Sequence, residues 1–192
     1  MESAVVLSFR KPGADKYREQ VFDASVFEGI FETHYKQVYN FVAYRVNNHH
    51  DVEDMVSAVF EKVITKYGSY DDRRASLEAW IISIAKNVVN DHFRYSKKKA
   101  FLSFDLVRDV AASIRNRGQP EEIFVAREEN AALMRALNTL TGKERTIVAM
   151  KFAAGLKNTD IARLMSLSET NVGIIIHRSM KKMRHQMEGE RL

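Results

Sequence analysis

Hydrophobic residues recur at helical spacing through much of the chain. Between residues 26 and 98, three stripes place an apolar side chain at every third or fourth position. The stripes are Phe27, Phe31, Tyr35, Val38 and Val42; Val52, Val56, Val59, Phe60, Val63 and Tyr67; and Leu77, Trp80, Ile81, Ile84, Ala85 and Val88. We therefore predict three amphipathic helices, which can enclose a core by themselves.

The rest of the chain contains helical patterns and breaks but no strand pattern. Residues 1–25 show no sustained period and are interpreted as an N-terminal extension, and periodicity lapses again over 99–120, which closes with NRGQPEE. Helical spacing resumes from Ile123 to Leu140. Thr141 and Glu144 then form a capping-box pattern that opens a helix ending at Gly155. The prediction is an all-α protein with two small helical domains, 26–98 and 121–192, joined by a flexible linker, 99–120.

The second domain ends in a helix-turn-helix pattern, NTDIARLM, SLS and ETNVGIIIHRSMKKMR. Small Ala162 lets a second helix cross closely, and Ser168 is placed to cap a helix that begins at Glu169. We expect one face of that helix to pack inward, through Val172, Ile176, Met180 and Met183.

The opposite face is polar and basic, as expected of a helix that enters the DNA major groove. We expect Thr170, Asn171 and Ile174 to meet base edges, and Arg178, Lys181 and Lys182 to meet phosphates. The full candidate set is Ser168, Thr170, Asn171, Gly173, Ile174, His177, Arg178, Lys181 and Lys182. The competing interpretation, a surface helix with solvated charges, is disfavoured by the preceding helix and turn.

Composition narrows the class of protein. The 192 residues carry 30 Lys and Arg against 25 Asp and Glu, with a pI near 9.4, so the chain is moderately basic. The absence of cysteine removes disulfides, thiolate chemistry and cysteine zinc sites. No apolar run approaches ~20 residues and no secretory signal is visible, so we expect a cytoplasmic protein without membrane insertion.

Sequence motifs for catalysis are missing as well. Asp71-Asp72 and Glu121-Glu122 are adjacent pairs, and no phosphate-binding glycine loop or nucleophile elbow occurs. His49-His50-Asp51 could catch a metal, although a polar helix start explains it better. We expect no catalytic residue, cofactor or metal site.

Three segments, in this order, carry a family resemblance: HDVEDMVSAVF, LEAWIISIAKNVVNDHFR and ALNTLTGKERTIVAMKFAAGLKNTDIARLM with its trailing basic helix. Together they resemble an extracytoplasmic-function (ECF) sigma factor of the bacterial sigma-70 family. The resemblance implies region 2 over 26–98 and region 4 over 121–192. It also implies a non-catalytic subunit that directs core RNA polymerase to the minus-thirty-five and minus-ten promoter elements. The implied partners are the polymerase β′ clamp helices and β flap, promoter DNA and an anti-sigma factor.

The resemblance assigns roles to two groups of residues in the first domain. The polymerase contacts, called the acidic face below, are Asp51, Asp54, Ser57, Ala58 and Glu61. The contacts to DNA near the start site are a loop, with Tyr70, Arg73 and Arg74, and a polar flank, with Ser83, Lys86, Asn87, Asn90, Arg94 and Lys97. An aromatic or guanidinium plane can stack on an extruded base. Trp80 is better explained as a core residue than as such a platform, and Asp91 as a structural ion-pair partner.

The chain departs from the family pattern at two places. Ser57 and Ala58 replace a Gln-Glu pair, and Gly173 and Ile175 stand where Lys and Arg are common. Gly173 either lets the DNA backbone approach closely or marks weak binding of the upstream element. Two other functions stay open at this level: a stand-alone helix-turn-helix regulator whose residues 26–98 sense a signal or dimerise, and a scaffold protein.

Overall fold

The computed structural model describes residues 24–46, 48–102 and 131–189, and these residues contain helices and turns but no strand. The N-terminal part holds α1 (Ala24–Arg45), α2 (His49–Lys66), the short 3₁₀ helix η1 (Tyr67–Ser69) and α3 (Leu77–Leu102). The C-terminal part begins with a helical stretch at 131–138. It continues with α5 (Gly142–Val148), the π-helical turn η2 (Ala149–Ala153), α6 (Asn158–Met165) and α7 (Glu169–Gly189). The prediction of an all-α chain is confirmed for this part of the protein.

The three predicted N-terminal stripes become the three long helices α1, α2 and α3, which pack on one another. Val38, Val59 and Ile81, one from each helix, are fully buried. The first half of the α1 stripe is less enclosed than expected, because Phe31 and Tyr35 keep 37% and 39% of their surface exposed. There the rings of Phe31 and Tyr35 pack against Phe60 at the edge of the core, with the centroids of Phe31 and Phe60 4.7 Å apart. Helix α3 continues to Leu102, four residues past the predicted domain boundary.

Local signals fix the start and the end of the helix at 142–153. Thr141 accepts from the backbone N–H of Glu144, and the Glu144 carboxylate accepts from the backbone N–H of Thr141, so the predicted capping box is present. Gly155 has a φ of +68°, a left-handed conformation that glycine adopts without strain. The backbone N–H of Leu156 donates to the carbonyl of Met150 at 3.0 Å, which closes this helix end.

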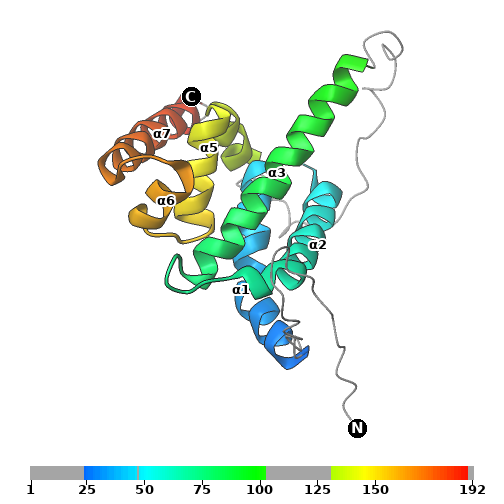
Figure 1. Ribbon diagram of the computed structural model, residues 1–192. Coiled ribbons are helices and arrows are strands. Elements are labelled where there is room, and N and C mark those ends of the chain that lie inside the picture. Colours follow the sequence, from blue (N-terminus) through cyan, green and yellow to red (C-terminus); the bar gives the residue numbers. More distant parts are fainter. Residues whose placement is uncertain (1–23, 47, 103–130, 190–192) are drawn as a thin grey trace, which may run out of the picture.

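The buried core of α1, α2 and α3 continues beyond these three helices. One continuous cluster of buried residues joins α1, α2 and α3 to Ile147, Met150, Leu156 and Ile161 of the C-terminal part. Figure 1 shows the reason: α5, α6 and η2 lie against α1 and α3, on the side of α3 away from α2. A smaller cluster, around Leu137 and Met183, belongs mainly to the C-terminal helices.

Hydrogen bonds from side chains to backbone carbonyls link the N-terminal part to the C-terminal part. Gln37 Nε2 donates to Ala154 O at 2.5 Å and Arg45 Nη1 donates to Gly142 O at 3.1 Å. Arg145 Nε donates to Tyr44 O at 2.5 Å, near the C-terminal end of α1, where a cation is favoured. In the described part of the chain, no helix is long and apolar enough to cross a membrane.

Candidate functional site

The helix-turn-helix forms as predicted, with α6 and α7 joined by a tight turn. Ser166 takes a left-handed conformation with a φ of +53°, and the backbone N–H of Leu167 donates to Ala162 O at 2.9 Å. Ser168 Oγ accepts from the backbone N–H of Asn171 at 3.2 Å, so the predicted cap of α7 is present. Ile161 and Ala162 are buried where the two helices cross.

Helix α7 has the two faces that its sequence predicts, with one correction. Val172 and Met183 are buried, but Met180 is 37% exposed, and fully buried Ser179 takes the inward position between them. The reason is the helical step: 172, 179 and 183 lie seven and four residues apart and stay on one side, whereas 180 is rotated about 100° from 179. The outward side chains, called the recognition face below, are Thr170, Asn171, Ile174, His177, Arg178 and Lys181, and all are exposed.

Lys182 and Gly173, two further candidates on α7, differ from the recognition face. Lys182 Nζ lies 2.6 Å from the carboxylate of Glu144, in an ion pair that ties the recognition helix to the start of α5. The hydrogen bond from Lys182, and then that from the Thr141 backbone, hold the pKa of the Glu144 carboxyl below its ordinary value. A Cβ added at Gly173 would meet nothing within 4 Å, so packing inside the protein does not require glycine there.

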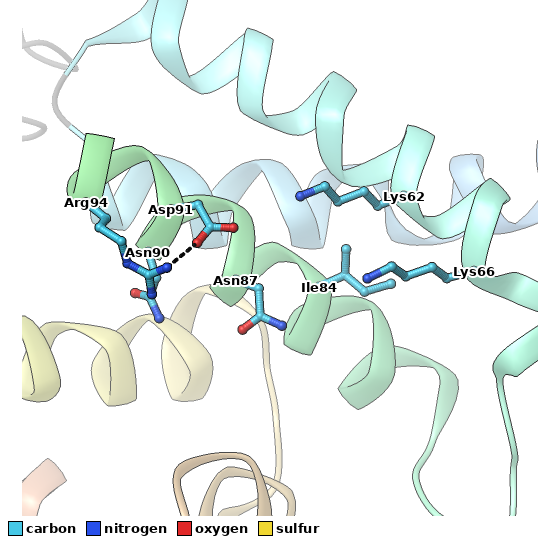
Figure 2. Close-up of a pocket in the computed structure, with 7 residues that line it drawn as sticks. All are labelled: Lys62, Lys66, Ile84, Asn87, Asn90, Asp91 and Arg94. Atoms are coloured by element: carbon cyan, nitrogen blue, oxygen red, sulfur yellow. Dashed lines mark ion pairs between the residues drawn. The ribbon is translucent and has the colours of Figure 1, made fainter. Parts of the chain in front are cut away.

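The polar flank on α3 divides into two environments. Asn87, Asn90 and Arg94 line an open cleft between α3 and α2, whose far wall holds Lys62 and Lys66 (Figure 2). Asp91 lies in the same cleft and pairs with Arg94 at 3.4 Å, as its predicted structural role requires. Because Lys62 and Lys66 lie one turn apart on a helix interpreted as acidic, sequence reasoning missed them. Residues four apart lie on one face of a helix, so the spacing of Lys62 and Lys66 is the signal that could have predicted a basic face there.

The other described residues of the flank have partners inside the protein. Lys86 Nζ donates to the carbonyl of Leu164, in α6, at 2.9 Å. Ser83 Oγ donates within its own helix to Trp80 O at 2.6 Å. Lys97 belongs to α3, but its side chain lies outside the described residues.

The loop between η1 and α3 is partly ordered by its own side chains. The ring of Tyr70 lies 6.2 Å from that of Tyr67 and 5.3 Å from Trp80, and its hydroxyl donates to Ala75 O at 3.2 Å. Tyr70 is thus half-buried, and desolvation raises its pKa. Arg73 and Arg74 are 87% and 86% exposed and share the carboxylate of Asp71. The hydrogen bond from Arg73 lowers the pKa of Asp71. Both guanidinium planes therefore face solvent.

The acidic face on α2 is open. Asp54, Ser57 and Glu61 are exposed, whereas Asp51 is half-buried and Ala58 packs partly against the core. The face is not covered by the C-terminal helices, which lie beyond α1 and α3 (Figure 1). The side chains of His49 and His50, at the start of α2, lie outside the described residues, and the described residues hold no cluster of metal-binding side chains.

Two family models match the sequence in the order of the two helical parts. Sigma-70 region 2 matches residues 30–99 and sigma-70 region 4 matches residues 130–183. The chain is 26% identical over 181 residues to the ECF RNA polymerase sigma factor BldN of Streptomyces coelicolor, across 90% of this chain and 67% of BldN. It is 27% identical over 165 residues to the ECF RNA polymerase sigma factor SigX of Bacillus subtilis, across 84% of each protein.

Solved structures share the fold. The chain resembles the sigma factor RpoE from Bartonella quintana, solved with the anti-sigma factor NepR, with a TM-score of 0.67 and 16% identity. The alignment covers 86% of this chain and 98% of RpoE. It also resembles CnrH, solved with the cytosolic domain of CnrY, with a TM-score of 0.65, 18% identity and coverage of 88% and 91%. The two region models, matched in order on the two helical parts and joined by these relatives, show that the chain belongs to the ECF group of the sigma-70 family.

Proposed function

We propose that this protein is an RNA polymerase sigma factor that directs core polymerase to promoters through a minus-ten and a minus-thirty-five element. The observation that carries the proposal is the succession of region 2 and region 4 along one chain. An acidic helix face, a basic cleft and a helix-turn-helix, each at a separate surface, support it. The protein supplies recognition and no catalytic group, and it acts in the cytoplasm, where the polymerase is.

The acidic face is the surface for the β′ clamp helices. Asp54 and Glu61 point into solvent two turns apart, so both carboxylates can reach one basic partner surface. Their negative charge would repel DNA phosphates, which favours a protein partner. Asp51 and Ala58 flank this contact. The β flap binds the C-terminal domain.

The cleft between α2 and α3 binds promoter DNA near the start site. Lys62, Lys66 and Arg94 supply positive charge, and the amides of Asn87 and Asn90 supply donors and acceptors for phosphates or base edges (Figure 2). Arg73 and Arg74 stand at the neighbouring loop, where an exposed guanidinium plane can stack on an extruded base. Tyr70 contributes mainly by holding this loop against Trp80.

The recognition face binds the upstream element. Thr170 and Asn171 lie at the N-terminal end of α7, the end that meets base edges in a helix-turn-helix. Ile174 is 44% exposed and can contact a thymine methyl group. Arg178 and Lys181 follow on the same face and reach phosphates. Ser168 contributes by capping, and Lys182 is held by Glu144.

An anti-sigma factor is the proposed regulatory partner. The support is the likeness in fold to RpoE and CnrH, which were solved with an anti-sigma factor and with the cytosolic domain of CnrY. Purification of the tagged chain from cells under several growth conditions tests this point. Polymerase as its one stoichiometric partner under every condition would contradict it.

Run-off transcription with core polymerase and a genomic promoter library tests the main proposal. We expect transcripts that depend on the protein and that weaken in a double Asp54→Ala, Glu61→Ala variant. The matched control is Glu28→Ala, Glu188→Ala, which removes two exposed carboxylates outside the acidic face. Loss of transcripts in the first variant only, with parallel loss of core binding, locates the polymerase surface.

The same assay, with DNA-binding and core-binding measurements, distinguishes a sigma factor from a stand-alone regulator. A chain that binds operator DNA tightly by itself, never binds core polymerase and yields no transcripts would replace the proposal with a stand-alone helix-turn-helix regulator. Equal losses in the acidic-face variant and in its control would reject the assigned surface while leaving the function intact.

A further inference from the structure

We propose that Asp91 reads a base in the cleft between α2 and α3. Its carboxylate accepts a hydrogen bond from the exocyclic amino group that a cytosine or an adenine presents on the major-groove edge. The inference rests on the proposed function, because it concerns the promoter DNA bound in that cleft. It adds a residue that sets sequence specificity, where the other charged residues of the cleft supply affinity.

The cleft is basic except at one position. Lys62 and Lys66 of α2 stand on one wall, and Arg94 belongs to the α3 wall. Asp91 is the one carboxylate among the described side chains that line the cleft. Figure 2 shows it on the side of α3 that faces α2, with the ammonium group of Lys62 turned toward it. A negative charge therefore lies among three positive charges, in a cleft proposed to hold a polyanion.

The ion pair with Arg94 does not account for this negative charge. It joins residues three positions apart at 3.4 Å, and the side chains of Asp91 and Arg94 are 44% and 79% exposed. Ion pairs this open to solvent contribute little to stability, because water screens the charges and the side chains must be ordered. Asp160 and Arg163 of α6 make a pair with the same spacing and the same distance outside the cleft. The pair geometry is thus not peculiar to the cleft, whereas the placement of the carboxylate is.

Most of the acceptor capacity of Asp91 is unused. An ionised carboxylate offers about four lone-pair sites on its two oxygens. Arg94 Nη1 approaches one of these oxygens, Oδ1. Among the described residues, Asp91 has no further hydrogen bond or ion pair. The rest of the carboxylate can therefore accept from a donor that enters the cleft.

The charge of Asp91 restricts which part of the DNA can be that donor. A carboxylate repels phosphate, and on the major-groove edge it also repels guanine O6 and thymine O4, which are acceptors. The N4 amino group of cytosine and the N6 amino group of adenine are the donors on that edge. Asp91 therefore selects cytosine or adenine and disfavours guanine and thymine.

The neighbouring side chains suit a nucleotide placed in this way. Asn87 and Asn90 carry amides that can donate and accept beside Asp91, and buried Ile84 adds an apolar surface to the lining. The two lysines of α2 can hold a phosphate while Asp91 holds a base edge. Helix α2 then positions the DNA backbone, and α3 reads the sequence.

This role separates affinity from specificity. Removal of the carboxylate makes the cleft more positive, so DNA in general should bind at least as tightly as before. The preference for a base with an amino group should be lost at the same time. A carboxylate that served only to hold Arg94 in place would leave the base preference unchanged.

Transcription by holoenzyme from a promoter library with a randomised minus-ten element measures the preference. Asp91→Asn keeps the shape of the side chain but adds a donor, so it can also pair with guanine O6 or thymine O4. At one position of the element, we expect the wild-type chain to favour cytosine or adenine at least about fivefold over guanine and thymine. In the variant this ratio should fall below about twofold.

Asp160→Asn is the matched control. It removes a carboxylate from an ion pair of the same geometry outside the cleft, so the base preference should stay at the wild-type value. Circular dichroism of the three proteins checks that each has the same helical content.

A base analogue identifies the contacted group. At the position found, cytosine or adenine is replaced by an analogue that lacks the exocyclic amino group. Wild-type holoenzyme should bind this DNA at least about fivefold more weakly than the parent DNA, whereas Asp91→Ala, which has no acceptor, should bind both within about twofold. Because both proteins meet the same DNA, any effect of the analogue on the duplex itself cancels in the ratio. The cytosine and adenine arms show which of the two bases is read.

A base preference that survives unchanged in Asp91→Asn would overturn the proposal and leave the sigma function intact. A wild-type preference for guanine or thymine at the position that responds to Asp91 would do the same. A wild-type chain that neither binds core polymerase nor yields transcripts would instead refute the proposed function and this inference with it.

Discussion

The two proposed DNA surfaces, the recognition face on α7 and the polar flank on α3, are built in different ways. The recognition face comes from a single helix whose outward residues follow from helical spacing, and all six of them are exposed. The flank has equally regular spacing, yet Lys86 contacts α6, Ser83 bonds within its helix, and Asn87 lines a cleft that it shares with lysines of α2. The helical spacing of polar residues therefore predicts an exposed surface only where no other helix packs beside it.

The largest expected effect tests whether the N-terminal part, which carries the flank, unfolds together with the C-terminal part. Met150→Ala removes a fully buried side chain from the shared cluster and should lower the free energy of unfolding by about 2–5 kcal/mol. Trp80, the chain's one tryptophan, lies in the N-terminal part. Its fluorescence and the helical circular dichroism should shift together in denaturant.

Phe152→Ala is the matched control for this variant, since Phe152 belongs to the same π-helical turn but is 51% exposed. We expect its stability to change by less than about 0.5 kcal/mol. A Met150→Ala protein in which Trp80 fluorescence kept the wild-type midpoint would show that the two parts unfold independently.

The next effect concerns the recognition face alone. Arg178→Ala with Lys181→Ala removes two proposed phosphate contacts, which should reduce the slope of log affinity against log salt by about 1.8 on upstream-element duplex. The measurement is a salt titration of holoenzyme binding, with Lys143→Ala, an exposed lysine of α5, as the control. An unchanged slope would remove both residues from the DNA surface.

The cleft should show a smaller and different dependence. Lys62→Ala with Lys66→Ala should reduce the salt slope by about 1.4 for single-stranded minus-ten DNA and leave duplex upstream binding unchanged. Lys36→Ala, an exposed lysine of α1, is the control. If upstream binding fell equally, the lysines would act through overall charge rather than through the cleft.

The smallest effect comes from Glu144→Gln, which breaks the ion pair with Lys182 and weakens the cap. Because the folded state lowers the pKa of Glu144, its stabilisation is present above the ordinary value of 4.5 and is lost as pH falls through the folded value. We expect the variant to lose about 1 kcal/mol at pH 7 and to show a flatter decline of stability below pH 5.

The same variant frees Lys182 next to the recognition face. The affinity for upstream-element duplex should rise slightly, because the Lys182 ammonium, no longer paired with Glu144, can bind a phosphate. Thermal unfolding between pH 7 and pH 3, together with a binding titration, checks both halves. Wild-type and variant stability curves that coincide across this range would show that the Glu144 pair contributes nothing to stability.

Local interactions explain what the sequence by itself determined. The helical periods, the Thr141 capping box, the Gly155 stop and the Ser168 cap depend on residues within a few positions of one another, and each was predicted and is present. The family resemblance was likewise carried by short continuous segments of the sequence. The two faces of α7 followed as well, apart from the exchange of Met180 for Ser179.

Long-range packing decided the rest. The closure of the C-terminal helices on α1 and α3, the pairing of Lys86 with Leu164 and the joining of Lys62 and Lys66 to the α3 cleft link residues from different helices. A hydrophobic stripe predicts that a helix face will be buried. It does not predict which element covers that face, because burial of apolar surface is non-directional. Only the tertiary structure fixed that choice, and with it which polar residues stay free to bind DNA.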